Sequence, residues 1–303
     1  MLQASKGGCG SRSIESKATR VVNFKIDPNR LRRNLQMIVG ERNPFDAQPH
    51  LDEVASFVET EFRSYGLDVE SDFFTYGGET FRNIVARHPG EQNEPLIIVG
   101  AHLDSVVGTP GADDNASGVA VLLESARLLA QERLRPEVLF CAFNLEELNM
   151  IGSTAFARKL KAAGTKVDGM ISLEMVGYTD ARAGSQRYPV GLSRLYPDHG
   201  DFIGVVGNWK SNALLGKFTA AMREVADLQV ETLSVPGKGM IIPAVRLSDH
   251  APFWDLGYPA LMVTDTSFYR NPHYHGGTDT LETLDIDFMG KVGEGVARAV
   301  SAL

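Results

Sequence analysis

The sequence predicts a single α/β domain in which a central, mostly parallel mixed β-sheet carries helices on both faces. Two observations lead to this fold class. Short apolar runs, such as 96–99 and 138–143, alternate along the chain with segments of helical periodicity, a pattern typical of βαβ units around parallel strands. In addition, 303 residues can bury a large core, and we find neither an internal repeat nor a low-complexity tract that would divide the chain.

Each element follows from a local signal. Asp27 before Pro28 predicts a helix start, and Gly66 and Gly164 are expected to end two further helices. Helical periodicity predicts helices over 27–40, 51–66, 117–133, 153–163, 212–226 and 285–303. Runs with β character predict strands over 67–74, 81–88, 95–101, 138–143, 170–174, 202–206, 244–247 and 260–263. Residues 178–200 show neither periodicity, and a loop this long is usually functional or mobile.

Composition narrows the class of protein. The chain is 43% hydrophobic and 22% charged, and its formal net charge of −8 argues against a nucleic-acid partner. Its two cysteines do not suggest a disulfide framework, which leaves the redox compartment open. No stretch approaches the roughly 18 apolar residues of a membrane span. Residues 1–20 are polar and basic without an apolar core, so we expect a disordered leader that is no secretory signal, and a cytoplasmic protein by default.

Candidate metal ligands follow the predicted strands. His102 and Asp104 end the apolar run that starts at Leu96, and residues two apart in a strand share a face. A carboxylate beside a metal-bound imidazole commonly fixes its tautomer. On its own such a pair is more often a satisfied pair in the core. Four further polar clusters lie just beyond apolar strands: Asp113-Asp114, Glu146-Glu147, Glu174, and His273-Tyr274-His275.

Each of these clusters also has an ordinary structural explanation, such as a helix cap, a solvated turn or a surface histidine pair. Ligands of open α/β sheets collect at the carboxyl ends of strands, so five clusters in that position together favour a metal site. Imidazoles and carboxylates without thiolates suit zinc. Two ions would be neutralised by Asp114, Glu147, Glu174 and a bridging hydroxide. If 146 and 147 lie in an extended segment, their side chains face opposite ways, which leaves Glu146 free to act as the general base.

Six segments, taken together, carry a family resemblance. They occur in the order GAHLDS, GADDNASG, FNLEELNMIGS, SLEMVGY, SDHAPFWDLGYPAL and YHGGTDT, over about residues 96–281. The set resembles the zinc-dependent aminopeptidase family that also contains glutamate carboxypeptidase and glutaminyl cyclase. The resemblance implies a catalytic domain over 21–303 with two zinc ions, Asp104 behind the imidazole, Glu146 as base and Tyr274 as an oxyanion donor. It implies these metal ligands: His102, Asp114 as the bridge, Glu147, Glu174, and His275 in preference to His273.

The chain departs from the family at two places. Glu174 stands where the family more often has Asp, and Asn144-Leu145 replaces the usual small residues before the Glu pair. Asp249-His250 matches a family segment near the substrate pocket, although a helix cap explains it equally well. Members of the family are often secreted, in contrast to the cytoplasmic default.

The favoured hypothesis is an aminopeptidase that acts on peptides, with no membrane or nucleic-acid partner. Alternatives are a single-zinc transferase resembling glutaminyl cyclase, and a carboxypeptidase or dipeptidase using the same site. Arg246 or Arg270 could hold a substrate carboxylate in the latter case. A non-catalytic binding domain is a further alternative, but such a relative would be expected to lose ligands.

Overall fold

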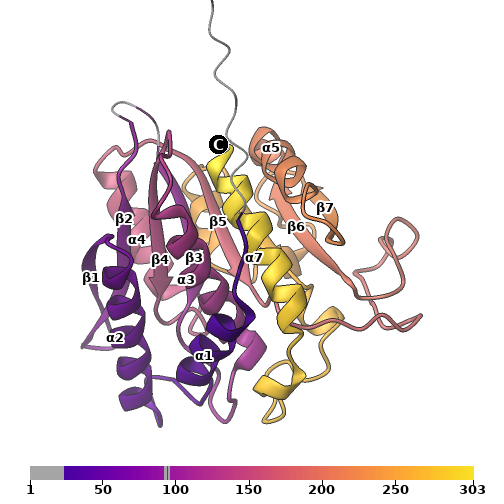
Figure 1. Cartoon of the computed structure of the whole chain (residues 1–303), viewed down its shortest axis with the longest axis horizontal. Coiled ribbons are helices and arrows are strands. Elements are labelled where there is room, and N and C mark those ends of the chain that lie inside the picture. Colours follow the sequence, from indigo (N-terminus) through magenta and orange to yellow (C-terminus); the bar gives the residue numbers. More distant parts are fainter. Residues whose placement is uncertain (1–23, 92–93, 95) are drawn as a thin grey trace, which may run out of the picture.

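The computed structural model describes residues 24–91, 94 and 96–303, so the expected leader over residues 1–20 lies outside the described part. Eight strands form one mixed sheet in the order β1-β2-β4-β3-β5-β8-β6-β7 (Figure 1). The strands are β1 (Asp68–Tyr76), β2 (Glu79–His88), β3 (Leu96–His102), β4 (Glu137–Phe143), β5 (Val167–Glu174), β6 (Phe202–Asn208), β7 (Gln229–Val235) and β8 (Ala260–Thr264). The predicted fold class, a single α/β domain with a mixed sheet, is confirmed.

The centre of the sheet is parallel. β4, β3, β5 and β8 run in the same direction, so their carboxyl ends meet at one edge. The antiparallel pairs are β1 with β2, β2 with β4, and β6 with β8. Parallel neighbours need crossover helices, which is why helices separate most of the central strands in the sequence.

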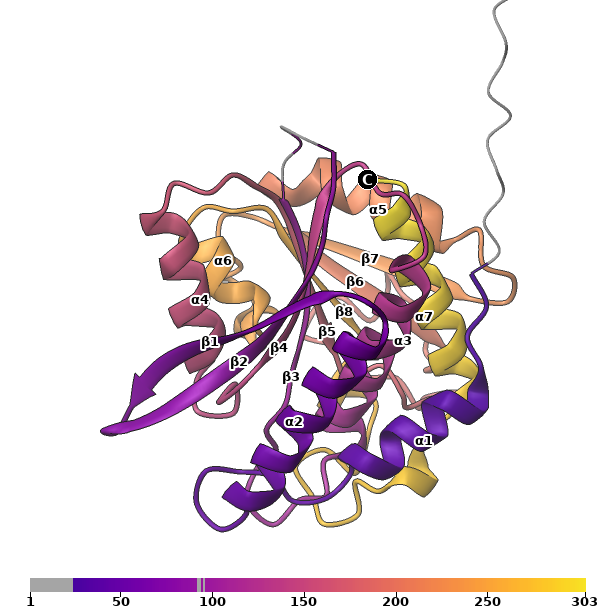
Figure 2. The ribbon, with the colours of Figure 1, turned by 60° about the vertical axis from the view of Figure 1, so that its left-hand side comes forward.

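Helices cover both faces of the sheet, as Figure 2 shows: α4 and α6 lie on one face and the others on the opposite face. The helices are α1 (Pro28–Ile38), α2 (Gln48–Ser64), α3 (Gly118–Leu129), α4 (Ile151–Ala162), α5 (Asn212–Met222), α6 (His250–Asp255) and α7 (Ile286–Ser301). Asp27 caps α1 as predicted, since its carboxylate accepts a hydrogen bond from the Asn29 amide at 2.9 Å. Gly66, with φ +85°, follows the end of α2.

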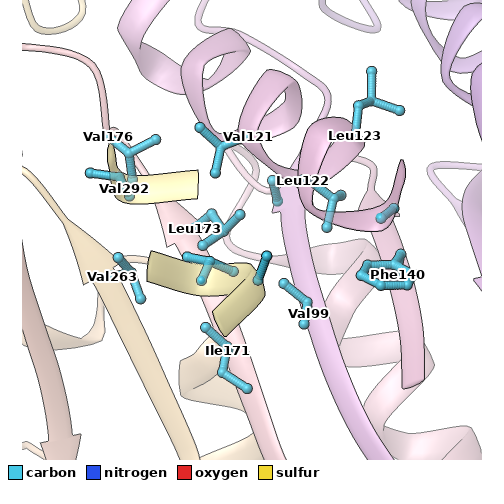
Figure 3. Packing of buried hydrophobic residues seen from close by; sticks show 14 of the residues in the cluster. Val99, Val121, Leu122, Leu123, Phe140, Ile171, Leu173, Val176, Val263 and Val292 are labelled. Carbon is cyan, nitrogen blue, oxygen red and sulfur yellow. The ribbon is translucent and has the colours of Figure 1, made fainter. Parts of the chain in front are cut away.

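The alternation of β3 side chains divides the core into two layers. Ile97 and Val99 pack under α3 and α7, whereas Leu96 and Ile98 point to the face that α4 and α6 cover. Figure 3 shows the larger layer, in which side chains of β3, β4, β5 and β8 pack against α3. Burial on both faces explains why these strands are apolar runs rather than alternating patterns.

One expected strand is wrong, and one strand was not predicted. Residues 244–247 were expected to be a strand, but Pro243–Arg246 form a 3₁₀ turn before α6. Four residues are too short to fix a strand, and Pro243 favours the first turn of a helix. The missed strand is β7, at the edge of the sheet, where only Val230 and Val235 are buried. Helix α3 is also shorter than expected and ends at Leu129.

The segment 178–200 is irregular, as predicted, apart from one bridge between Asp180 and Gly200. Figure 1 shows it extending beyond the strands near β6 and β7. Among the described residues, no helix is both long and apolar enough to cross a membrane.

Candidate metal centre

The predicted ligands converge at the carboxyl edge of the parallel strands. His102 is the last residue of β3, and Glu174 is the last residue of β5. Asp114 lies in the segment Ala112–Ser117 that leads into α3, at a kink where its own backbone angles, φ −102° and ψ 90°, are not helical. Glu147 follows β4, and His275 lies in the segment after β8. Residues far apart in the sequence thus meet because the central strands are parallel.

Three buried side chains form the first group of candidate ligands. The Nε2 atom of His102 lies 3.2 Å from Oδ1 of Asp114 and 3.5 Å from Oε2 of Glu174. One ligand atom from each residue lies within 4.8 Å of the other two. This spacing lets one cation contact all three, because zinc binds nitrogen and oxygen ligands at about 2.0–2.2 Å.

A second group shares Asp114 with the first. Oδ2 of Asp114 lies 3.1 Å from Nε2 of His275, and that nitrogen lies 3.4 Å from Oε2 of Glu147. The Asp114 carboxylate therefore presents one oxygen to each imidazole. Such an arrangement suits two adjacent cations bridged by Asp114.

Unsatisfied polar atoms show that the residues fit a cation. Within the described part of the chain, His102 Nε2, Asp114 Oδ1, Glu147 Oε1 and Glu174 Oε2 are buried and have no hydrogen-bond partner. Buried polar atoms are rarely left unpaired, because desolvation without compensation is costly. His102, Asp114 and Glu174 belong to the first group of candidate ligands and Glu147 to the second, so both groups hold buried atoms that a divalent ion would satisfy.

The shifted pKa values of residues at this centre also indicate a cation site. Burial lowers the pKa of His102, but the Glu174 and Glu146 carboxylates outweigh it and raise that pKa well above its usual range. Burial raises the pKa of Glu147 to about 7, with the Asp114 charge as the next cause. Burial also raises the pKa of Glu146 well above its usual range. Without a bound cation, raised pKa values of this kind offset part of the concentrated negative charge by proton uptake.

Asp104 lies behind His102, with an arrangement different from the expected one. Its carbonyl oxygen lies 3.1 Å from His102 Nδ1, whereas its carboxylate oxygen is 3.6 Å away. The carboxylate instead accepts hydrogen bonds from the backbone amides of Glu146 and Glu147, at 2.9 and 3.1 Å. Asp104 therefore connects the first imidazole to the segment that carries both glutamates.

That segment is a turn and not the extended stretch that the sequence was expected to form. Leu145, which stands where the family has small residues, is fully buried with φ +58°, a conformation that costs a non-glycine residue roughly 1–2 kcal/mol. The two side chains nevertheless diverge: Oε2 of Glu146 lies 3.9 Å from His102 Nε2, and Glu147 faces His275.

Two supporting residues were missed by the sequence analysis. The carboxylate of Asp279 accepts hydrogen bonds from the backbone amides of Asp113 and Asp114, at 2.9 and 3.1 Å. The buried guanidinium of Arg42 donates to the carbonyls of Gly40, Leu103, Pro110 and Gly111. Together they fix the loop between His102 and Asp114. Asp279 belongs to the YHGGTDT segment, but no local signal marks Arg42.

Three further candidate residues from the sequence, Tyr274, His273 and Asp113, belong to neither ligand group. The Tyr274 ring stacks on the His275 ring, with centroids 3.7 Å apart. His273 is turned toward Thr278, 2.9 Å from its Nδ1. Asp113 is not a ligand in either group; its carboxylate accepts hydrogen bonds from the Gly177 amide and the Asn271 side chain.

Asp249 and His250 are both buried at the start of α6. The Asp249 carboxylate makes no capping hydrogen bond, and burial raises its pKa to about 7. His250 Nε2 lies 2.8 Å from the Val245 carbonyl oxygen. Asp249 thus stands at the N-cap position of α6 without a capping hydrogen bond from its side chain.

Comparisons with known proteins agree with this geometry. The sequence profile of "Peptidase family M28" matches residues 83–300. The uncharacterized protein YfbL of Escherichia coli K12 is 39% identical over 89% of this chain and 86% of its own length. A "probable zinc metalloprotease" of Pyrenophora tritici-repentis is 28% identical over 71% of this chain. A "leucine aminopeptidase 1" of Arthroderma otae is 30% identical over 68% of it. The chain spans about half the length of these two fungal relatives.

Solved structures share the fold. A zinc aminopeptidase from Bacillus subtilis superposes with a TM-score of 0.71 at 17% identity, covering 93% of this chain and 95% of its own. A glutaminyl cyclase from Porphyromonas gingivalis superposes with a TM-score of 0.63 at 22% identity, covering 90% of this chain and 95% of its own. At these identities the likeness concerns the architecture alone.

Proposed function

Because this chain belongs to peptidase family M28, we propose that it is a zinc-dependent aminopeptidase whose catalytic centre holds two ions. The observation that carries the proposal is Asp114, whose two oxygens belong to two separate groups of three candidate ligands. His102 and Glu174 complete the first group, and Glu147 and His275 complete the second. Curated relatives named as zinc metalloproteases and leucine aminopeptidases support both the metal and the reaction.

Zinc at this centre would supply Lewis-acid polarisation of the scissile carbonyl and lower the pKa of a nucleophilic water. The protein supplies the proton transfers. Glu146 ligates in neither group, yet its carboxylate is mostly buried beside His102. In this arrangement Glu146 accepts a proton from the attacking water and delivers it to the leaving amine. Tyr274 lines the cavity beside Glu174. Burial raises the pKa of Tyr274, so its hydroxyl stays protonated and can donate to the developing oxyanion.

A carboxypeptidase would need an arginine free to hold the substrate carboxylate. Both arginines considered for this role make hydrogen bonds within the protein, which favours aminopeptidase activity. Arg246 donates to the Lys238 carbonyl and to Asp255. Arg270 is buried and donates to Gln186 and to the Tyr178 carbonyl. Activity on a panel of N-terminally free and blocked peptides tests the choice: free peptides should be hydrolysed, and hydrolysis of blocked peptides alone would favour the carboxypeptidase.

Substitution of Asp104 tests the link between the imidazole and the glutamate turn. The Asp104→Asn variant loses one of two acceptors for the amides of Glu146 and Glu147. We expect kcat to fall about 10–100-fold, the size of effect typical of groups that orient metal ligands, with the protein still folded by circular dichroism. Asp168→Asn, a change at an exposed carboxylate at the amino end of β5, the end opposite Glu174, should leave kcat unchanged. Parental kcat in Asp104→Asn would contradict the role.

Removal of metal should destabilise the fold. A chelator would leave the carboxylates of Asp114, Glu147 and Glu174 without a counter-charge. A ligand at about 100 times its dissociation constant contributes roughly 2.7 kcal/mol, so we expect the melting temperature to fall by at least about 5 °C. The control is the same chelator saturated with zinc. An unchanged melting temperature would mean that the carboxylates do not form a compact cation site.

A further inference from the structure

Two of the three acidic candidate ligands lie on backbone that a carboxylate from another part of the site holds in place. The Asp104 carboxylate accepts a hydrogen bond from the backbone amide of Glu147 at 3.1 Å. The Asp279 carboxylate accepts one from the backbone amide of Asp114, also at 3.1 Å. The third acidic ligand, Glu174, has no carboxylate of this kind beside its backbone among the described residues, so another group must fix its position.

The sheet supports Glu174 on one side only. Glu174 is the last residue of β5, and it still pairs with Thr264 of β8. On the other side, the pairing of β5 with β3 ends at Gly100 and Ser172, two residues before the ligand. Backbone groups buried beyond that point need other partners, because an unpaired buried amide or carbonyl is costly.

Asn115, the residue after Asp114, supplies these partners. Its Nδ2 donates to the Leu173 carbonyl at 2.8 Å, and its Oδ1 accepts from the Met175 amide at 3.1 Å. One side-chain amide thus binds the backbone on both sides of Glu174. Any shift of the strand end toward or away from Asp114 would break at least one of these bonds.

The Asn115 side chain is itself held rigidly. It is fully buried, and its Oδ1 also accepts from the Gly118 amide at 3.1 Å, at the start of α3. A Cβ atom at position 118 would lie 2.2 Å from this oxygen, so the close approach requires glycine. Three hydrogen bonds therefore fix the amide between the start of α3 and the end of β5.

The contacts of Asn115 concern one ligand group and not the other. In the described part of the chain, its side chain bonds to residues 118, 173 and 175, none of which carries or adjoins Glu147 or His275 of the second group. Asp114, which both groups share, is held separately through its amide by Asp279. Loss of the Asn115 side chain should consequently displace Glu174 more than Asp114.

We propose that Asn115 is a positioning residue, which sets the separation of Glu174 from Asp114 and thereby the zinc affinity of the first ligand group alone. This inference rests on the two-ion centre proposed above. Substitution of residues that orient metal ligands typically lowers metal affinity about 10–100-fold. We therefore expect Asn115→Ala to weaken zinc binding by the first group by about this factor and to leave binding by the second group unchanged.

The test measures the zinc dissociation constant, by competition with a chromophoric chelator, in two full-length backgrounds that each retain one complete group. His275→Ala retains the first group, and Glu174→Ala retains the second. Adding Asn115→Ala to the His275→Ala background should raise the dissociation constant about 10–100-fold. Adding it to the Glu174→Ala background should leave the constant at the value of that background.

Ser117→Ala is the matched control, because Ser117 is buried and joins the same two segments. Its hydroxyl donates to the Asp113 carbonyl at 2.7 Å and accepts from the Val176 amide at 3.0 Å. Val176 lies two residues beyond Glu174, so this variant loosens the two segments without removing the bonds that flank the ligand. It should lower the melting temperature and leave both dissociation constants unchanged.

The split between the two backgrounds separates positioning from a general structural role. Equal weakening in both backgrounds, or an unchanged constant in the His275→Ala background, would overturn the role of Asn115 and leave the two-ion centre in place. Binding of fewer than two zinc ions by the parent would overturn the two-ion centre, and this inference with it. If Asn115→Ala fails to fold, Asn115→Ser is measured instead with the same expected split, because one hydroxyl cannot bond to both flanking groups.

Discussion

Replacing Glu146 with Gln is expected to lower kcat by about 10²–10⁴-fold, the usual contribution of a general base, while the zinc content stays at the parental value. The amide has nearly the same shape but cannot accept the proton. Glu146 is absent from both groups of candidate ligands, so its loss should not release metal. Steady-state kinetics on leucine amide, with elemental analysis of the same preparation, would measure both effects.

Glu147→Gln is the matched control for this variant, because the two residues are adjacent on one turn and both amides bond to Asp104. Glu147 belongs to the second ligand group, so its variant should lose metal as well as activity. If Glu146→Gln retained parental kcat, or if it lost zinc as Glu147→Gln does, the assignment of the base would be wrong.

Replacing Asp114 with Ala should have the second large effect. Both ligand groups contain this carboxylate, so we expect the zinc content to fall below one ion per chain and kcat to fall by roughly 10³-fold or more, because metal ions contribute several kcal/mol to such reactions. Single substitutions of Glu174 or His275 should remove one ion and leave the other, because each residue belongs to one group.

The neighbouring Asp113→Asn variant is the control for Asp114. Its carboxylate bonds to the Gly177 amide and to Asn271 rather than facing the ligand atoms. We expect parental zinc content with a lower melting temperature. Retention of two zinc ions by Asp114→Ala would mean that the carboxylate does not bridge the centre.

The convergence of the candidate ligands was predictable because sheet topology brings them together. His102 and Glu174 are the last residues of parallel strands, and the ends of parallel strands necessarily share one edge. In the sequence, these candidate ligands could therefore be recognised as polar residues that directly follow apolar runs. The central strands were predictable for a related reason. They are buried on both faces, so each appears in the sequence as a continuous apolar segment.

Features that depend on contacts between distant segments were not predictable. The Arg42 guanidinium holds the loop from Leu103 to Gly111 by donating hydrogen bonds to its carbonyl groups. No motif around residue 42 in the sequence indicates this role. The edge strand β7 has too few buried residues to give a clear pattern. The cavity beside Glu174 exists because segment 178–200 folds over β6 and β8, which only the tertiary structure reveals.

The turn that carries the glutamates shows that a predicted orientation of two side chains can rest on an incorrect local conformation. Opposite orientation of Glu146 and Glu147 was expected from an extended backbone. The structure achieves it in a turn in which Leu145, Asn149 and Met150 all have positive φ. The Asp104 carboxylate stabilises this conformation by accepting both glutamate amides.

The zinc-to-protein ratio of the dialysed, active chain decides whether the centre holds two zinc ions bridged by Asp114. Elemental analysis should give two zinc ions per chain in the parent and one in His275→Ala. A single tightly bound zinc ion in the parent, together with cyclisation of N-terminal glutamine and no hydrolysis of peptides, would contradict the account and favour the transferase alternative.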